Sequence, residues 1–308
     1  MISLRYRDKA TAIHKLNPLV KLVWVAAIFI LSLIFNHPVY LVLLFISTLP
    51  LVITARVLRE WVAVMKFAFY LCLAIIIINA LVSNHGSHVL WQAPFRIPPI
   101  GAPAVTLESL FFGLGMSLRL LSVISAFTIL TFTVHPDDVM LVMIKLKLPY
   151  KSVLVTLLST RFMPVLIDDV ERIGAVQRSR GLELDNGSLL HRLRSRLSII
   201  APLLSNSLDR TVQVAEAMES RAYSSGATRS FYREIKLNQL DIPALILVIL
   251  PLAQGIFMRC WGQGDYQYYP TLEKISVAGF ELVMLPLLFF LLSMIVPFAL
   301  VKKRVELD

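Results

Sequence analysis

Apolar stretches of roughly membrane-spanning length recur along the chain, with polar segments between them. A helix that crosses a bilayer needs about 20 mostly apolar residues, because lipid offers the backbone no hydrogen-bond partner. Six stretches meet or approach this requirement: 19–35, 39–55, 61–82, 107–134, 242–258 and 277–301. The pattern predicts an all-α, polytopic helical membrane protein with about six transmembrane helices.

One long polar segment, residues 135–240, interrupts this pattern and predicts a series of further helices. Apolar positions within 165–180 repeat at steps of three and four residues, as an amphipathic helix requires. Proline residues punctuate the segment, so we expect helices to begin at Pro136, to end around Pro164 and to begin again near Pro202.

Charge is scarce and unevenly placed. The 308 residues are 57% hydrophobic and 16% charged, with a net charge of +10 and a mean hydropathy of +0.72. An ordinary soluble domain carries about a quarter charged residues, so the composition excludes a simple soluble globule or a disordered chain and disfavours a nucleic-acid-binding protein. Of the 30 Lys and Arg residues, 26 fall in segments that share one side of the membrane with the N-terminus. The positive-inside rule then predicts a multi-pass protein of the cytoplasmic membrane with both termini in the cytoplasm.

The segments predicted to lie on the outer side of the membrane, 83–106 and 259–276, have the composition of loops rather than of folded domains. Glu108 and Glu281 lie near the ends of predicted spans, where exposure to solvent is expected. The two cysteines are apolar in context and are expected to be packing residues.

Two predicted helices of the polar segment end in the same way. The first ends in Gln177-Arg178-Ser179-Arg180-Gly181, and the second ends in Met218-Glu219-Ser220-Arg221-Ala222. An arginine at a helix C-terminus is favourable to the helix itself through the dipole, which is the purely structural interpretation. Small neighbours also leave a guanidinium free to enter the groove of a partner and to donate several directed hydrogen bonds there.

The chain resembles the transmembrane T component of energy-coupling factor (ECF) transporters, which are ABC-type importers of vitamins and metal ions. The resemblance rests most on the two Ala-Arg-Gly-type motifs, here Ser179-Arg180-Gly181 and Ser220-Arg221-Ala222. Serine replaces alanine in both motifs, and alanine replaces glycine in the second. Further matching elements follow in the family's order: His14-Lys15-Leu16-Asn17-Pro18, Lys21-Leu22, Arg119-Leu120, His135-Pro136 and Leu148-Pro149.

The resemblance implies a coupling role without catalysis or a bound cofactor, since ATP is bound by partner subunits. Residues 1–134 would form an N-terminal membrane domain with four transmembrane helices, 135–240 the cytoplasmic coupling helices, and 241–308 the C-terminal transmembrane helices. Two ABC-type ATPase subunits would dock at Gln177, Ser179, Arg180, Gly181, Glu219, Ser220, Arg221 and Ala222. Coupling-helix packing is expected from Leu208, Val212, Ala215 and Met218. The membrane part would hold a substrate-binding S component, surrounded by lipid.

Arg119 is the one basic residue near the middle of a predicted span. A charge within the membrane normally has a partner, because it is costly there. Arg119 is therefore expected to make an intramembrane polar contact with another helix or with the S component. The structural alternatives are that it pairs within the bundle, or that the span is offset and its side chain extends to the membrane surface.

Two other classes of function remain open. One is a polytopic membrane enzyme acting on a lipid or isoprenoid, with Asp168, Asp169 and Glu171 holding a metal; adjacent helical residues diverge by about 100°, which disfavours that site. The other is a stand-alone secondary transporter, which normally needs more intramembrane polar residues. The sequence holds no P-loop motif, so the chain is not expected to hydrolyse ATP that way.

Overall fold

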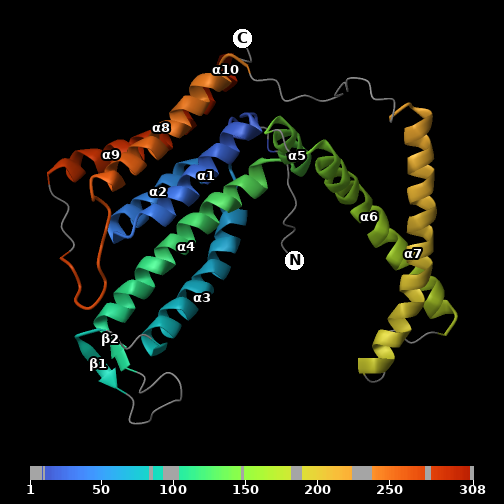
Figure 1. Cartoon of the computed structure of the whole chain (residues 1–308), viewed down its shortest axis with the longest axis horizontal. Coiled ribbons are helices and arrows are strands. Elements are labelled where there is room, and N and C mark those ends of the chain that lie inside the picture. The colour runs from blue at the N-terminus through green and yellow to red at the C-terminus, as the bar shows by residue number, and fades with distance from the viewer. Residues whose placement is uncertain are drawn as a thin grey trace. The chain divides into compact units, whose positions relative to one another are not determined.

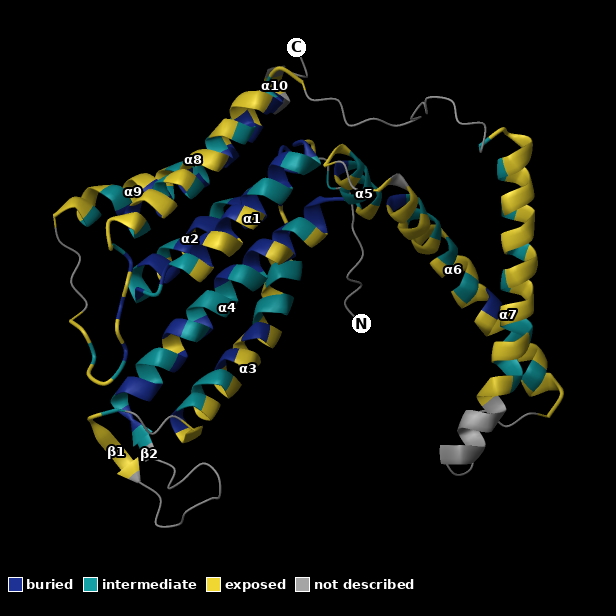
Figure 2. Cartoon of the chain, in the orientation of Figure 1, coloured by how far each residue is buried: buried dark blue, intermediate teal, exposed yellow. Residues whose placement is uncertain are grey.

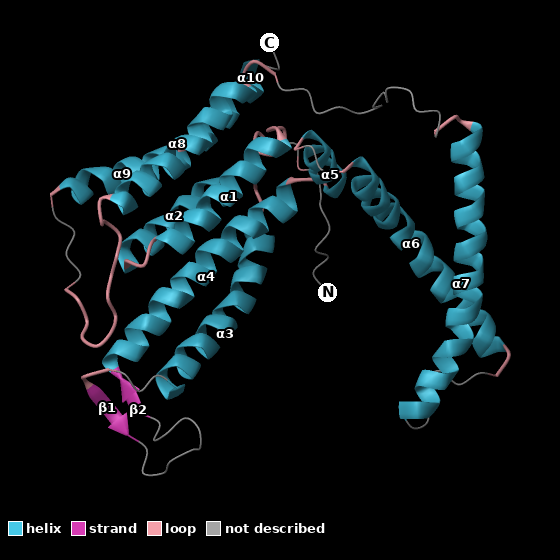
Figure 3. Ribbon diagram, in the orientation of Figure 1, coloured by secondary structure: helices cyan, strands magenta, loops and turns pink. Residues whose placement is uncertain are grey.

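The computed structural model describes residues 9, 11–82, 86–92, 104–146, 149–181, 189–223, 238–274 and 279–305. Residue contacts divide the chain into two compact units, each described here by itself. One unit comprises Met1–Val139 with Ile235–Asp308, and the other comprises Met140–Glu234. Helices dominate both units (Figure 3), which confirms the all-α prediction.

The first unit is built from helices of mainly apolar sequence. Their bounds are α1 Pro18–Ile34, α2 Pro38–Thr54, α3 Leu58–Val82, α4 Leu107–Thr133, α8 Asp241–Cys260, α9 Phe280–Ser293 and α10 Ile295–Val305. Helix α4 packs against α1, α2 and α3, while α1 packs against α8 and α2 against α9 (Figure 1). The short helix α5, Pro136–Lys145, follows α4.

The core of this unit lies where α1, α2, α8 and α9 meet. Trp24, Ile28, Tyr40, Leu44 and Leu288 are all at most 1% exposed. Helix α3 is different, because aromatic and aliphatic side chains face outward over most of its length (Figure 2). Such an outward apolar surface suits a helix that faces lipid.

Four helical segments are long and apolar enough to cross a membrane by length and composition: Leu58–Val82, Leu107–Thr133, Asp241–Cys260 and Phe280–Lys302. Helices α1 and α2 are apolar but have 17 residues each, or about 25 Å at 1.5 Å per residue, which is near the lower limit for a span. Six apolar segments therefore correspond to the six predicted stretches.

The last predicted span is not one continuous helix. It breaks at Met294, between α9 and α10. Pro297 has no N–H to bond the carbonyl of Ser293, four residues earlier, so a regular helix loses a hydrogen bond at this point.

Part of the segment expected to be a plain loop forms a small β-hairpin. Strands β1, Val89–Gln92, and β2, Ala104–Thr106, pair antiparallel, with Trp91 opposite Val105. Glu108 is fully buried beneath this hairpin instead of exposed. One carboxylate oxygen of Glu108 accepts hydrogen bonds from the backbone N–H of His88 at 3.1 Å and from the Ser87 hydroxyl at 2.9 Å, and it lies 2.8 Å from His88 Nδ1.

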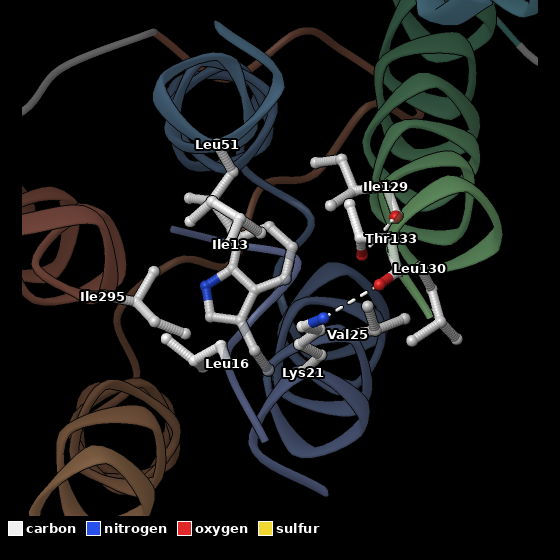
Figure 4. A pocket seen from close by; sticks show the side chains of 10 residues that line it. Ile13, Leu16, Lys21, Val25, Leu51, Ile129, Leu130, Thr133 and Ile295 are labelled. Atoms are coloured by element: carbon white, nitrogen blue, oxygen red, sulfur yellow. Dashed lines mark hydrogen bonds between the residues drawn. The ribbon is translucent and has the colours of Figure 1, made fainter. Parts of the chain in front are cut away.

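Two basic side chains cap the C-terminal ends of each other's helices. Lys21 of α1 donates from Nζ to the carbonyl of Thr133, the last residue of α4, at 2.8 Å (Figure 4). Arg119 of α4 donates from Nε to the carbonyl of Ser32 in α1 at 2.8 Å and from Nη2 to that of Phe35 at 3.0 Å. Carbonyls at a helix end carry the negative end of the dipole and have no intrahelical partner, so cations are favourable there.

Candidate functional site

The second unit contains two long helices, each of which continues through a proline. Helix α6 spans Tyr150–Ser179 through Pro164, and α7 spans Leu189–Ser220 through Pro202. The helix breaks expected at these prolines are therefore wrong. A proline deprives only one carbonyl of its N–H partner, the one four residues earlier.

At Pro202 a side chain from the other helix compensates for that loss. The carbonyl deprived by Pro202 is that of Ser198, and it accepts a hydrogen bond from the Gln177 amide at 3.4 Å. Gln177, expected from its motif to contact an ATPase, thus joins α6 to α7. The sequence signal that could have found this contact is the pairing of a mid-helix proline with an amide side chain on the neighbouring helix.

A buried carboxylate makes the second contact between α6 and α7. Asp169 is 4% exposed, and its two oxygens accept from Arg172 Nη2 at 2.7 Å and from Arg210 Nη2 at 3.0 Å. Both carboxylate oxygens are therefore engaged by arginines. Among the residues that the structure describes, no group of three or more metal-ligating side chains is found, so the geometry gives no support to a metal at Asp168, Asp169 and Glu171.

The packing expected from the apolar face of α7 is not made within the described part of this unit. Leu208 and Val212 are 58% and 56% exposed, Ala215 is exposed, and Met218 is half-buried. The α6–α7 contact lies instead around Asp169, Gly174 and Gln177 of α6. Leu208 and Val212 continue an exposed apolar row on α7 that begins at Ile200 and Leu204.

The first motif ends α6 in a left-handed turn. Arg180 is the C-cap residue, and its N–H bonds the carbonyls of Val176 and Gln177. Gly181 follows with φ of +82° and donates its N–H to the carbonyl of Arg178 at 2.9 Å. Glycine suits this position because it adopts positive φ without steric cost.

The second motif ends α7 in the same conformation with a less suitable residue. Ala222 has φ of +58° and donates its N–H to the carbonyl of Glu219 at 2.8 Å. The N–H of Tyr223 then bonds the carbonyl of Met218 at 3.0 Å, which is the pattern of a Schellman helix end. A left-handed conformation costs a residue with a Cβ roughly 1–2 kcal/mol. The replacement of glycine by alanine therefore strains this turn but keeps its geometry.

The serines of both motifs behave almost as alanines. The Ser179 hydroxyl donates to the carbonyl of Ala175 at 3.1 Å, and the Ser220 hydroxyl donates to that of Ala217 at 3.0 Å. Each hydroxyl is satisfied by its own helix. The motif therefore presents a small surface beside its arginine, although serine stands where the family has alanine.

Both arginines of the motifs are exposed. Within the part of the chain that the structure describes, no hydrogen bond or ion pair joins either guanidinium to another residue. Because α6 and α7 run antiparallel across each other, Arg180 and Arg221 lie toward opposite ends of the helix pair (Figure 1). Glu219, Ser179 and Ser220 are exposed beside them. The second unit thus displays two similar cationic helix ends rather than one composite site.

Comparison with known proteins identifies the chain's relatives. The CbiQ family model, described as a cobalt transport protein, matches residues 9–231, which include α1–α7 and both arginine motifs. The chain belongs to the CbiQ family. The expected kinship is confirmed, and with its long apolar helices the chain is a multi-pass membrane protein of a transport family.

Three curated relatives of similar sequence share one name. The chain is 30% identical to the energy-coupling factor transporter transmembrane protein EcfT of Streptococcus thermophilus, over 82% of this chain and 96% of the relative. It is 29% identical to the EcfT protein of Streptococcus equi, over 83% of this chain and 94% of the relative. It is 25% identical to the EcfT protein of Bacillus subtilis, over 84% of this chain and 98% of the relative.

Arg119, the remaining site residue, lies in the first unit and contacts other helices. Besides its two bonds to α1 carbonyls, Nη2 donates to the Asn36 amide oxygen at 2.7 Å, and Nη1 lies 3.4 Å from the sulfur of Met116. These contacts join α4 to the end of α1, so Arg119 makes a polar contact with another helix.

Proposed function

We propose that this chain is the transmembrane coupling subunit of an ECF-type importer and transmits ATP-driven motion from two cytoplasmic ATPase subunits to a membrane-embedded S component. The relatives' name and the CbiQ match support a place in such a complex. The S component would determine the substrate, a vitamin or a metal ion. On this proposal the nucleotide is bound by the partners, and the chain itself neither binds a cofactor nor catalyses a reaction.

The observation that carries the proposal is the pair of exposed arginines at equivalent helix ends. A left-handed residue after each arginine stops the helix sharply, and the serine before it is folded back on its own helix. Each guanidinium therefore lies at a helix end with small neighbours, where it can enter a groove of a partner and donate hydrogen bonds in several directions. Two such ends fit a pair of similar ATPases, one arginine to each.

The contacts between α6 and α7 supply the mechanical link. Gln177 lies only three residues before Arg180, and it bonds the Ser198 carbonyl of α7. A displacement of an ATPase at Arg180 would thus be transmitted to the other helix through this bond and through Asp169.

The experiment is co-purification of the ATPase subunits with the tagged chain from mild detergent. The double variant Arg180→Ala plus Arg221→Ala should lose both ATPases and ATP-driven uptake, while membrane insertion stays intact. Arg161→Ala, at an exposed position of α6 away from the motifs, is the matched control and should behave as wild type. Full uptake by the double variant would contradict the proposal.

A further inference from the structure

A cavity of about 270 Å³ lies in the first unit, apart from the arginine motifs. It is bounded by the α1–α2 turn, the first half of α4 and the segment between α8 and α9. Its lining includes Asn36, Met116, Arg119, Gln267, Tyr268 and Tyr269. This volume far exceeds that of a single water and approaches the lower limit of small-molecule sites.

The cation in this cavity has no carboxylate partner among the described residues. Arg119 has five N–H donors, and four of them are used by Ser32, Phe35, Asn36 and Met116. Three of these partners are neutral oxygens, which share the charge without cancelling it. One Nη1–H remains on a side chain that lines the cavity.

Two carboxylates lie near the cavity. Glu273 accepts a hydrogen bond from the backbone N–H of Gln267 at 3.2 Å, and Asp265 is balanced by another arginine. The Asn36 amide nitrogen donates to Asp265 at 3.1 Å, and Asp265 pairs with Arg259 at 3.2 Å. The hydrogen bond from Asn36 and the Arg259 guanidinium hold the pKa of Asp265 below its usual value. The set of Arg119, Asp265 and Arg259 thus carries one net positive charge.

The tyrosine side chains that line the cavity are suited to a polar group at the membrane surface. Tyr268 donates its hydroxyl to the carbonyl of Asn36 at 2.8 Å, and burial raises its pKa to about 12, so it stays a neutral donor. Tyr266 and Tyr269 lie beside it. Tyrosine is typical of the headgroup level of a bilayer.

We propose that this cavity binds a phosphate oxyanion, which pairs with Arg119 between the tyrosine rings. A phospholipid headgroup and free inorganic phosphate share this chemistry. The inference does not depend on the coupling role.

The test measures thermal unfolding of the delipidated protein in detergent, with two probes in separate titrations. One probe is inorganic phosphate, with chloride at equal ionic strength as the blank, and the other is a short-chain phosphatidylglycerol. A saturable rise in the melting temperature is expected with at least one probe. A response to the lipid alone identifies a headgroup as the source, and a response to both probes identifies the oxyanion itself.

Variants locate the binding without removing Arg119, which also caps α1. Gln267→Glu places a carboxylate at the exposed rim and should weaken the apparent affinity about tenfold or more, because like charges repel at close range. Met116→Trp should fill the cavity and have a similar effect. Gln213→Glu on α7 makes the same chemical change elsewhere and should match the wild type. The proposal is overturned if neither probe stabilises the wild type, or if Gln267→Glu and Met116→Trp respond as the wild type does.

Discussion

At the scale of single residues, the two arginine motifs differ at one position that matters physically. Gly181 and Ala222 both occupy left-handed backbone, and only glycine does so without a steric cost. The second motif therefore forms the same helix end as the first at lower local stability. The departure from the family pattern is an energetic one, since the bond from the N–H of the left-handed residue to the carbonyl three residues earlier is present at both ends.

Ala222→Gly should relieve this strain by about 1 kcal/mol. The Tyr223 amide, bonded to Met218 in this turn, should then exchange its hydrogen roughly fivefold more slowly in hydrogen-exchange mass spectrometry. Gly181→Ala should have the opposite effect at the end of α6. Equal exchange in wild type and Ala222→Gly would show that the turn is not strained.

A second residue-scale prediction concerns pH. His37 is buried and is the N-cap of α2, where its Nδ1 accepts from the N–H of Val39 at 3.3 Å. Burial lowers the pKa of His37 below its usual 6.5, against the opposing charges of Glu281 and Glu273. Folding therefore favours the neutral ring, so this stabilising contribution is complete above about pH 6.5 and declines as the pH falls toward the lowered value.

The melting temperature of the purified protein should accordingly fall below about pH 6.5. His37→Asn keeps an acceptor at the cap and should make this decline shallower. His135→Asn, at the more exposed histidine that immediately precedes α5, is the matched control. A His37→Asn profile as steep as that of the wild type would exclude His37 as the cause.

At the scale of elements, the sequence predicted well where helices form and less well where they end. Apolar length located the spans of the first unit, and proline marked the start of α5 correctly. The helix ends predicted at Pro164 and Pro202 were wrong, because a long helix tolerates the loss of one hydrogen bond. At Pro202 the Gln177 amide also replaces the missing donor. That compensation comes from a distant residue, which a local pattern does not reveal.

The site itself was predicted in part. Matching spacing picked out Arg180 and Arg221, and the structure shows both exposed at similar helix ends. The packing role given to Leu208 and Val212 came from the family resemblance and from their apolar character. Periodicity identifies an apolar face but not what covers it, and in this unit the helices cross elsewhere. Glu108 was similarly misjudged because the β-hairpin that buries it has little local signal.

Asp169→Asn should loosen the joint between α6 and α7 by about 1 kcal/mol, because the carboxylate bonds two arginines that are partly open to solvent. In a Cys260→Ser background, we expect a broader distribution of spin-label distances between Arg161→Cys and Gln213→Cys. We also expect reduced uptake and retained ATPase binding. Glu171→Gln, at an exposed neighbour, should change none of these. Loss of ATPase binding in Asp169→Asn would show that the carboxylate serves docking rather than the joint.

At the scale of the whole molecule, the predicted orientation in the membrane determines which side of the bilayer each helix end faces. The distribution of basic residues predicts that the N-terminus and residues 135–240 lie in the cytoplasm. Helix α8 would then start inside at Asp241 and end outside at Cys260. Cys260 is exposed, whereas Cys72 is buried in α3.

A membrane-impermeant thiol reagent should therefore label the wild-type chain in intact cells, and Cys260→Ser should abolish the labelling. In that background Ser220→Cys should react only after the membrane is permeabilised. Labelling of Ser220→Cys in intact cells, with Cys260 protected, would reverse the proposed topology. The readout is a gel shift or mass increase of the chain.

The mutual capping of α1 and α4 has a consequence for how the protein is made. The carbonyls of Ser32 and Phe35 receive Arg119 from 87 and 84 residues further along the chain. When α1 leaves the ribosome, these two carbonyls lack this donor until α4 has been synthesised. The C-terminal end of α1 therefore acquires its guanidinium partner only after α2, α3 and the first half of α4 have been made.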